Sequence, residues 1–278
     1  MKLKTVSKVV GAVALFFIIC AEIDRRTYRK KVPTIKEYFS KIPLSPISCF
    51  VKMCSDKENL TPFVDIEENF EDFKILEDNW QTIKEEALAL IEHGKTSSIQ
   101  GDQFFSEKIT SDGKWKKYYI KWYQPVSDEV EKDCPKTVEL INSIPQVKLA
   151  MFSILEPGAY IKPHLGPFKS CLRYHLGLDT PEDENCFISV DGEKYSWKNG
   201  ESVLFDDTFE HWVKNDTNKR RVILFCDVQR PLRSGFSNAI NSFIVNKLAP
   251  ITTRINDRLE KVTYDEPTED TEDKEDDD

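Results

Sequence analysis

Hydrophobic and polar residues alternate over short runs in the second half of the chain. The runs are separated by Gly, Pro, Asp and Asn, and they read VKLAMFSILEPG, SCLRYHLGLDTP, NCFISVDGEKYSW, GESVLFDD and RRVILFCDVQRP. Several short alternating runs at close spacing are typical of an antiparallel sandwich or jelly roll. The adjacent Asp191 and Gly192 add a tight-hairpin signal between two of the strands. The pattern therefore predicts a mainly β fold.

A helical period replaces the alternation in three other stretches. Asp78–Gly94, DNWQTIKEEALALIEHG, carries an apolar stripe at helical spacing, and Asp78 and Gln81 fit a capping box at its start. CPKTVELINSIP (134–145) predicts a short helix between two prolines. NAINSFIVNKLAP (238–250) is apolar on one side, which suits either a helix on a membrane surface or one packed on the domain. This pattern favours neither.

The N-terminal segment carries a membrane signal. Val9–Ala21 is uncharged, and the 18 residues from Val6 to Ile23 reach the short limit for a membrane span. Charged residues follow the apolar run in place of a small-x-small cleavage site, which favours an uncleaved anchor over a signal peptide. Because more cations follow the run than precede it, we expect residues 1–31 to anchor the protein with its main domain on the cytoplasmic side.

Charge and cysteine content narrow the class of protein. The net charge of -9 is concentrated in residues 264–278, which contain ten acids and one lysine. The rest of the chain is close to neutral, so no basic nucleic-acid face is predicted, and residues 263–278 are expected to be a disordered acidic tail. Seven scattered cysteines without a CxxC pair indicate reduced thiols. We therefore expect a main domain at 32–233, followed by a helical segment at 234–262.

Two arginines occupy unusual places in the predicted strands. In the strand 171–178, period two puts Arg173 and His175 on one face. In the last strand, Arg221 shares a face with Asp227. The face opposite Arg173 is apolar and consists of Leu172, Tyr174, Leu176 and Leu178. Because buried arginines need anionic partners, these positions indicate an anion site inside the fold.

Two histidines complete the candidate chemistry. His164 and His211 are 47 residues apart, and each lies at the edge of a predicted strand. This is the arrangement of a mononuclear iron site, because imidazole suits Fe(II) and open positions remain for oxygen and a co-substrate. A nearby arginine would bind the carboxylate of a keto acid with both arms of its fork. The pattern alone equally allows a loop histidine, a turn histidine and two structural ion pairs.

From about Gly113 to Leu232 the sequence resembles the aspartyl/asparaginyl β-hydroxylase family of Fe(II)- and 2-oxoglutarate-dependent dioxygenases. The bacterial lipid A hydroxylases are the branch that it resembles most. The motifs that carry the resemblance are KWYQP, CPKTVELINSIPQVKLAMFSILEPG, PHLGPFKSCLRYHLGL, VDGEKYSWKNGESVLFDDTFEHWVKN and RVILFCDVQRPL. The resemblance implies a double-stranded β-helix of the jelly-roll, cupin-like type with supporting helices. It also implies Fe(II), 2-oxoglutarate and O2 as cofactor and co-substrates.

The resemblance assigns roles residue by residue. His164 and His211 match the iron ligands, and Arg173 and Arg221 match contacts to the carboxylate of 2-oxoglutarate. The remaining co-substrate contacts match Ser153 and His175. The implied function is hydroxylation of an unactivated C–H bond, with a lipid A acyl chain as the favoured substrate and the membrane as partner.

One position departs from the lipid A branch, in which an aspartate lies two residues after the first histidine. This chain has Gly166 there, like the peptidyl hydroxylase branch, which works with two histidines and water in the vacant place. Asp206 and Asp207 correspond to turn positions in the family pattern and are not expected to bind iron. The departure supports two alternatives: a peptidyl aspartyl/asparaginyl β-hydroxylase and, from another class, a non-catalytic cupin-like binding module.

Overall fold

The computed structural model describes residues 45–98, 110, 113–166 and 169–248, together with Leu15, Ile18, Ile19 and Glu22. Most of the expected anchor at 1–31, residues 249–262 and the acidic tail lie outside these described residues. Within the described part of the chain, no helix combines the length and apolar character needed to cross a membrane.

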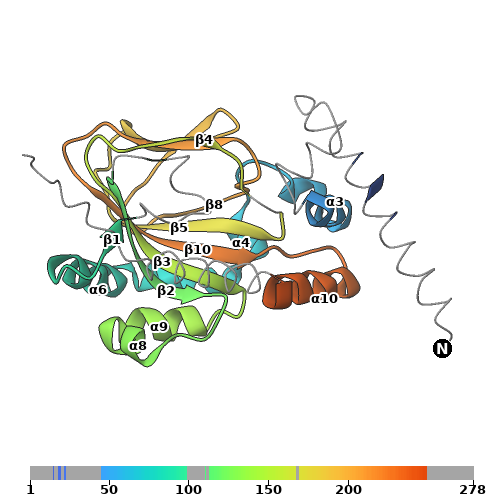
Figure 1. Ribbon diagram of the computed structural model, residues 1–278, viewed down its shortest axis with the longest axis horizontal. Coiled ribbons are helices and arrows are strands. Elements are labelled where there is room, and N and C mark those ends of the chain that lie inside the picture. Colours follow the sequence, from blue (N-terminus) through green and yellow to red (C-terminus); the bar gives the residue numbers. More distant parts are fainter. Residues whose placement is uncertain are drawn as a thin grey trace, which may run out of the picture.

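Two antiparallel sheets face each other at the centre of the molecule (Figure 1). The larger sheet has the order β1-β2-β3-β10-β5-β8 and the smaller one the order β4-β9-β6-β7. The strands of the larger sheet are β1 (Ser97–Ser98), β2 (Trp115–Trp122), β3 (Val147–Leu155), β5 (Cys171–Asp179), β8 (Ser202–Phe205) and β10 (Arg221–Gln229). The strands of the smaller sheet are β4 (Tyr160–His164), β6 (Cys186–Val190), β7 (Glu193–Ser196) and β9 (His211–Asn215).

The chain passes between the two sheets again and again from β3 to β10. Only β6 and β7 follow each other within one sheet, as a hairpin in which Asp191 and Gly192 both have positive φ, 51° and 90°. Asn-Gly and Asp-Gly pairs favour this turn, because both central residues must adopt the left-handed region. This winding is a jelly roll, and it confirms the mainly antiparallel β fold that the alternating runs predict.

Each strand of the larger sheet separates two different cores. The first core lies between this sheet and the helices and includes Leu172, Tyr174 and Leu176. The second core lies between the two sheets and includes Leu155, Phe205 and Ile223. Because side chains alternate across a strand, the residues between these leucines, such as Arg173 and His175, point into the space between the sheets. The predicted faces of the strand 171–178 are therefore confirmed.

Helices α6 (Trp80–Glu92), α8 (Asp128–Asp133) and α9 (Pro135–Asn142) cover the outer face of the larger sheet (Figure 1). Helix α6 buries Ile83, Ala87 and Leu90, as its stripe predicts. The predicted capping box at Asp78 is wrong, because Asp78 ends the preceding helix α5 (Lys74–Asp78) and Asn79 is the N-cap, without a side-chain bond.

The helices described between residues 45 and 73 are shorter than α6 and lead from one end of the molecule to the sheet. They are α3 (Ser45–Cys54), η1 (Lys57–Asn59), α4 (Ile66–Asn69) and η2 (Glu71–Phe73). After β10, helix α10 (Gly235–Phe243) begins with a capping box at Ser234 and continues into a π-helical turn, η3 (Ile244–Leu248). Helices α3 and α10 lie at the same end of the molecule, away from α6 (Figure 1).

Candidate iron and co-substrate site

The two candidate iron ligands lie side by side. His164 ends β4 and His211 begins β9, and the pairing of these strands places the two residues opposite each other. Their ring centroids are 4.1 Å apart, with an angle of 53° between the rings. His211 is buried and His164 is half-buried, so the pair lies at the edge of the space between the sheets. Residues distant in sequence are thus brought together as the predicted iron pair requires.

The backbone holds both imidazoles in one orientation. The Nδ1 atom of His164 is 2.7 Å from the carbonyl oxygen of Lys162, and Nδ1 of His211 is 3.0 Å from that of Phe209. Because a carbonyl only accepts, each Nδ1 carries the proton and donates it, which leaves the lone pair on each Nε2. Burial lowers the pKa of His164 to about 4 and also lowers the pKa of His211. Both rings are therefore neutral at physiological pH, which is the form that binds a metal.

Asp207 occupies the space in which a side chain at position 166 would begin. A Cβ atom built on Gly166 would lie 2.1 Å from Cγ of the Asp207 carboxylate. The Gly166 N–H also donates to the backbone carbonyl of Asp207 at 2.7 Å, so the two segments are locked together. Within the described residues, no three His, Cys, Asp or Glu side chains form a group that could hold a metal ion. Asp207 thus fills the place of the missing side chain without being arranged as a third ligand.

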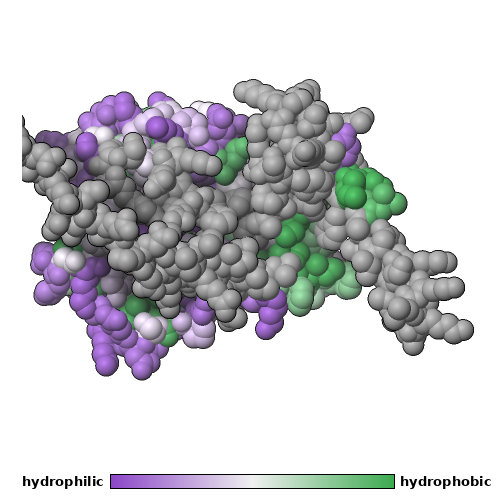
Figure 2. Space-filling view, in the orientation of Figure 1, coloured by the Kyte–Doolittle hydropathy of each residue, from purple (hydrophilic) through white to green (hydrophobic). Residues whose placement is uncertain are grey.

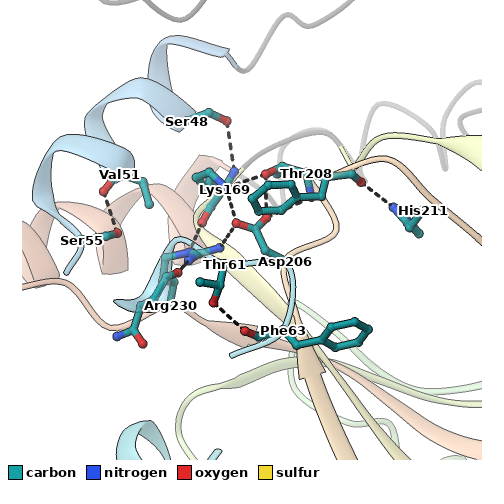
Figure 3. A network of polar contacts seen from close by, with 12 residues as sticks. Ser48, Val51, Ser55, Thr61, Phe63, Lys169, Asp206, Thr208, His211 and Arg230 are labelled. Carbon is teal, nitrogen blue, oxygen red and sulfur yellow. Dashed lines mark hydrogen bonds and ion pairs between the residues drawn. The ribbon is translucent and has the colours of Figure 1, made fainter. Parts of the chain in front are cut away.

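Asp206 belongs to a buried ionic network (Figure 3). Its Oδ2 atom lies 2.6 Å from Nη2 of Arg230 and also binds Nζ of Lys169, and both cations are buried. Its Oδ1 atom accepts the backbone N–H and hydroxyl of Thr208 at 3.0 and 2.6 Å. Despite burial, the two cations lower the pKa of Asp206 to about 2. Asp206 therefore fixes the loop between β8 and β9, which carries Asp207 and leads to His211.

Arg173 is held by two carboxylates. Its Nε atom donates to Asp207 at 2.9 Å, and its Nη1 atom donates to Asp227, the residue opposite it on β10. The hydroxyl of Tyr123 donates to the second oxygen of Asp227 at 2.6 Å. These acids raise the pKa of Arg173 even though burial acts in the opposite direction. Arg173 therefore already has its anionic partners within the protein.

Arg221, in contrast to Arg173, has no acidic partner among the described residues. It is 2% exposed, and in the described part of the chain no carboxylate forms an ion pair with it and its Nε has no hydrogen-bond partner. Its guanidinium lies 4.5 Å from the ring centroid of Trp197. Burial lowers the pKa of Arg221 to about 10. A buried cation without an acid is costly, so an anionic ligand here would be stabilised strongly.

His175 on β5 and Ser153 on β3 are the two further candidate contacts to the co-substrate. The His175 ring packs against Phe205 and Phe225, and neither of its nitrogens has a hydrogen-bond partner among the described atoms. Burial, together with the positive charge of Arg221, lowers its pKa well below the ordinary range, so the ring is neutral. Ser153 on β3 is buried and accepts a hydrogen bond from Nε1 of Trp115 at 2.9 Å. Its own proton thus remains available to an acceptor.

Four of the predicted residues, His164, His211, His175 and Arg221, are connected by ring contacts inside the jelly roll. The Phe205 ring contacts His211 on one side and His175 on the other, and the Trp197 ring links His175 to Arg221. Two imidazole Nε2 atoms at one end suit a divalent iron, and a lone guanidinium at the other suits a carboxylate. The donor set therefore fits Fe(II) together with 2-oxoglutarate.

Four residues shape the site in roles that the sequence does not predict. Asp207 and Asp227 hold Arg173, Tyr123 donates to Asp227, and Trp197 lies against Arg221. Asp227 was placed on the inner face of the last strand, but only the pairing of β10 with β5 shows that it lies opposite Arg173. For Asp207, Tyr123 and Trp197 the sequence holds no comparable signal, because they come from loops or strand ends.

Comparisons with known proteins agree with this architecture. A family model described as aspartyl/asparaginyl beta-hydroxylase matches residues 77–231, more than half of the chain. An ornithine lipid ester-linked acyl 2-hydroxylase from Rhizobium tropici is 40% identical over 127 residues, which cover 45% of each chain. Human aspartyl/asparaginyl beta-hydroxylase is 35% identical over 164 residues, 57% of this chain and 21% of the human one. The chain thus spans less than half the length of these two relatives.

Among solved structures, a Pseudomonas putida prolyl-4-hydroxylase matches with a TM-score of 0.39 and 17% identity, covering 55% of this chain and 87% of that chain. A similarity of this size adds nothing to the topology described above. The family match, in contrast, extends from α5 to the end of β10 and includes every candidate site residue. This chain belongs to the aspartyl/asparaginyl β-hydroxylase family.

Proposed function

We propose that this protein is an Fe(II)- and 2-oxoglutarate-dependent dioxygenase that hydroxylates an unactivated C–H bond. One observation carries the proposal: the same interior holds a pair of oriented neutral imidazoles and a buried arginine that forms no ion pair with any described acid. His164 and His211 would hold Fe(II), and Arg221 would bind the distal carboxylate of 2-oxoglutarate. When bound, Fe(II) with 2-oxoglutarate and O2 supplies the oxidising power for the reaction.

The remaining residues of the site position these groups. The carbonyls of Lys162 and Phe209 hold Nδ1 of each imidazole, so that Nε2 is the nitrogen that would bind a metal. Ser153 can donate its hydroxyl proton to the co-substrate, and neutral His175 can donate or accept one hydrogen bond beside it. Arg173 acts through others, because it ties Asp207 and Asp227 together. It orders the carboxylate next to Gly166, and it is not the primary anion site.

For the substrate we propose an acyl chain of a membrane lipid, with lipid A as the form that the sequence motifs favour. The R. tropici relative, whose name describes hydroxylation of an acyl group of ornithine lipid, supports the acyl class. The apolar segment Val9–Ala21 supports it as well, since we propose that it anchors the protein in a membrane with the catalytic domain on the cytoplasmic side.

Gly166 supports a second candidate, a peptidyl aspartyl/asparaginyl β-hydroxylase. The glycine resembles the peptidyl branch, and the human relative with that name is 35% identical over its matched region. A third candidate is a non-catalytic binding module. It would not explain why the two imidazoles are oriented alike or why the unfavourable burial of Arg221 is retained. The arrangement of the site therefore argues against it.

The first test is turnover of 2-oxoglutarate by the full-length protein with Fe(II), ascorbate and oxygen. The proposal predicts succinate formation that is lost in both His164→Ala and His211→Ala. Binding of Fe(II) and 2-oxoglutarate is measured in parallel by calorimetry. Folded protein that binds neither ligand would overturn the proposal and leave the binding module.

The second test separates the substrates by mass spectrometry. Lipids are extracted from cells with the active protein and from cells with the His164→Ala variant, and a candidate peptide is incubated with the purified protein. A mass increase of one oxygen on a lipid acyl chain supports the lipid substrate. The same increase on an Asp or Asn of the peptide, with unchanged lipids, would replace it with the peptidyl one.

A further inference from the structure

Helix α10 turns its apolar side away from the protein. Phe236 and Phe243 are 78% and 60% exposed, while the polar Ser237 and Asn241 are buried. Helical spacing puts Ala239, also exposed, on the same stripe as the two phenylalanines. Helices on a water-exposed surface show the opposite order, with the apolar stripe inside. The outward stripe thus faces water only because nothing in the described structure covers it.

The buried polar side shows that this orientation is specific. The Nδ2 atom of Asn241 donates to the carbonyls of Ser170 and Arg230 at 3.2 and 3.0 Å. Ser237 completes the capping box with Ser234 at the start of the helix. Rotating α10 to bury its phenylalanines would break these bonds and leave buried carbonyls without partners, which costs free energy for each. The exposed stripe is therefore a stable feature of the fold.

Helix α3 extends the same surface. The backbone N–H of Arg233, just before α10, donates to the carbonyl of Cys54 at 2.8 Å, and its Nη2 atom donates to the carbonyl of Ser55 at 2.6 Å. The end of α3 therefore lies beside the start of α10, and Met53 there is 58% exposed. Figure 2 shows hydrophobic surface where Figure 1 places α10. We call Met53, Phe236, Ala239 and Phe243 the apolar surface.

The charges around the apolar surface point to the occupant. The chain has 48 acids, yet residues 45–54 and 235–248 contain none. Lys52 lies in the first of these segments and Lys247 in the second. Arg233 directly precedes the second segment, and its side chain is more than half exposed although it pairs with Asp56. Exposed phenylalanines next to basic residues are typical of helices that lie in the interface of an anionic membrane. A second protein copy would have to match this cationic rim with acids.

We propose that the apolar surface docks on a lipid bilayer. Phe236, Phe243 and Met53 enter the boundary between headgroups and acyl chains, and Lys52 and Lys247 face anionic headgroups. This docking is independent of the substrate class proposed above, because it concerns where the domain lies.

The two helices that carry the apolar surface also contact the start of β5, the strand that carries Arg173 and His175. Lys169 and Ser170, which directly precede β5, contact both helices: the Lys169 N–H donates to Oγ of Ser48 in α3, and the Ser170 carbonyl accepts from Asn241 in α10. The bilayer thus lies next to Lys169 and Ser170, at the start of the strand that carries Arg173 and His175.

Photocrosslinking of the full-length protein on vesicles tests the docking. A benzophenone amino acid replaces Phe236 or Phe243, and in matched controls it replaces Tyr160 or Ile75, which are 41% and 40% exposed on other elements. The vesicles contain phosphatidylcholine and phosphatidylglycerol, and mass spectrometry identifies the adducts. Lipid adducts at Phe236 and Phe243 should exceed those at Tyr160 by about tenfold, the effect of burying one aromatic side chain.

Each other result would overturn the docking. Adducts to a second copy would show a dimer surface, adducts to residues 9–21 of the same chain would show an internal cover, and yields equal to the Tyr160 control would show no cover. Thermal unfolding and binding of 2-oxoglutarate check that each variant is folded. In a further arm, Lys52→Glu and Lys247→Glu should each lower the lipid adduct at Phe236 by about fivefold on anionic vesicles. An unchanged yield would refute the role of the cations.

Discussion

At the scale of single residues, Gly166 is a packing position rather than a vacant ligand position. A Cβ atom there would overlap the carboxylate of Asp207, which is held by Arg173. An aspartate introduced at 166 would therefore need Asp207 to move before it reached the histidines. The glycine and Asp207 together act as one unit that differs from the ordinary two-histidine, one-carboxylate arrangement.

The Gly166→Asp variant should therefore lose stability without gaining iron affinity. We expect a loss of about 1–3 kcal/mol in the free energy of unfolding, as for other overpacked sites, measured by urea denaturation. The double variant Gly166→Asp with Asp207→Gly removes the overlap and should recover part of the stability. Tighter Fe(II) binding by Gly166→Asp alone, with unchanged stability, would contradict this account of the site.

The two arginines of the site should respond in opposite ways to the same substitution. Arg173→Met leaves Asp207 and Asp227 without their cation, and breaking such a buried pair costs about 3–5 kcal/mol of stability. Arg221→Met removes a buried cation that has no acid among the described residues, so stability should hold or rise. Its KM for 2-oxoglutarate should increase at least tenfold, because a charged hydrogen bond is worth about 1.5–3 kcal/mol.

Thermal unfolding and steady-state kinetics on both arginine variants measure the two effects separately. If Arg173→Met raised KM for 2-oxoglutarate more than Arg221→Met while remaining fully stable, Arg173 would be the main carboxylate contact. The assignment of Arg221 from its missing partner would then be wrong.

At the scale of elements, the loop between β8 and β9 depends on the buried network around Asp206. Asp206→Asn leaves the cations Lys169 and Arg230 facing a neutral amide, and we expect a loss of about 3–5 kcal/mol in urea denaturation. The matched control is Asp216→Asn, which breaks the exposed pair with Lys214 and should cost at most about 1 kcal/mol. Equal losses in the two variants would show that the network contributes no more than a surface ion pair.

The predictions that succeeded are those that follow from geometry along one element. Period two places Arg173 and His175 on the inner face of β5, whatever the rest of the fold does. The helical period likewise identifies α6 but not its first residue, because the separate helix α5 takes up Asp78.

The features that the sequence could not predict depend on which elements lie side by side. Nothing in the local pattern shows that Asp207 occupies the space beside Gly166, 41 positions earlier in the chain. The orientation of α10 is a similar case. Its pattern shows one apolar side, but only the bonds of Asn241 show that this side faces out.

At the scale of the whole molecule, the two cores differ in how many polar side chains they bury. The core between the larger sheet and the helices is mostly apolar, and it contains the inner residues of α6 and α9, with Thr137 of α9 as a buried polar exception. The core between the sheets mixes apolar residues with buried His175, Arg221 and Asp227. The first core thus provides the stability that allows the second to hold His175 and Arg221, which have buried nitrogens that lack partners among the described atoms.

This division predicts a pH dependence of unfolding. His175 has a strongly lowered pKa in the folded protein because burial disfavours the imidazolium and Arg221 repels it. Once unfolded, the chain binds a proton at this residue near the ordinary value of about 6.5, whereas the folded protein does not. The unfolded state therefore binds more protons below that pH, and the stability of the fold should decrease as the pH falls from 7 to 5.

Replacing His175 by Phe, which suits its contacts with Phe205 and Phe225, removes this contribution. Urea denaturation at several pH values should then show the variant gaining stability relative to the natural protein by up to about 1.4 kcal/mol for each pH unit below 6.5. The exposed His93→Gln variant controls for the loss of a histidine elsewhere. A constant difference between His175→Phe and the natural protein at all pH values would mean that His175 binds its proton equally in both states. The inference that His175 is a neutral imidazole in the folded protein would then be wrong.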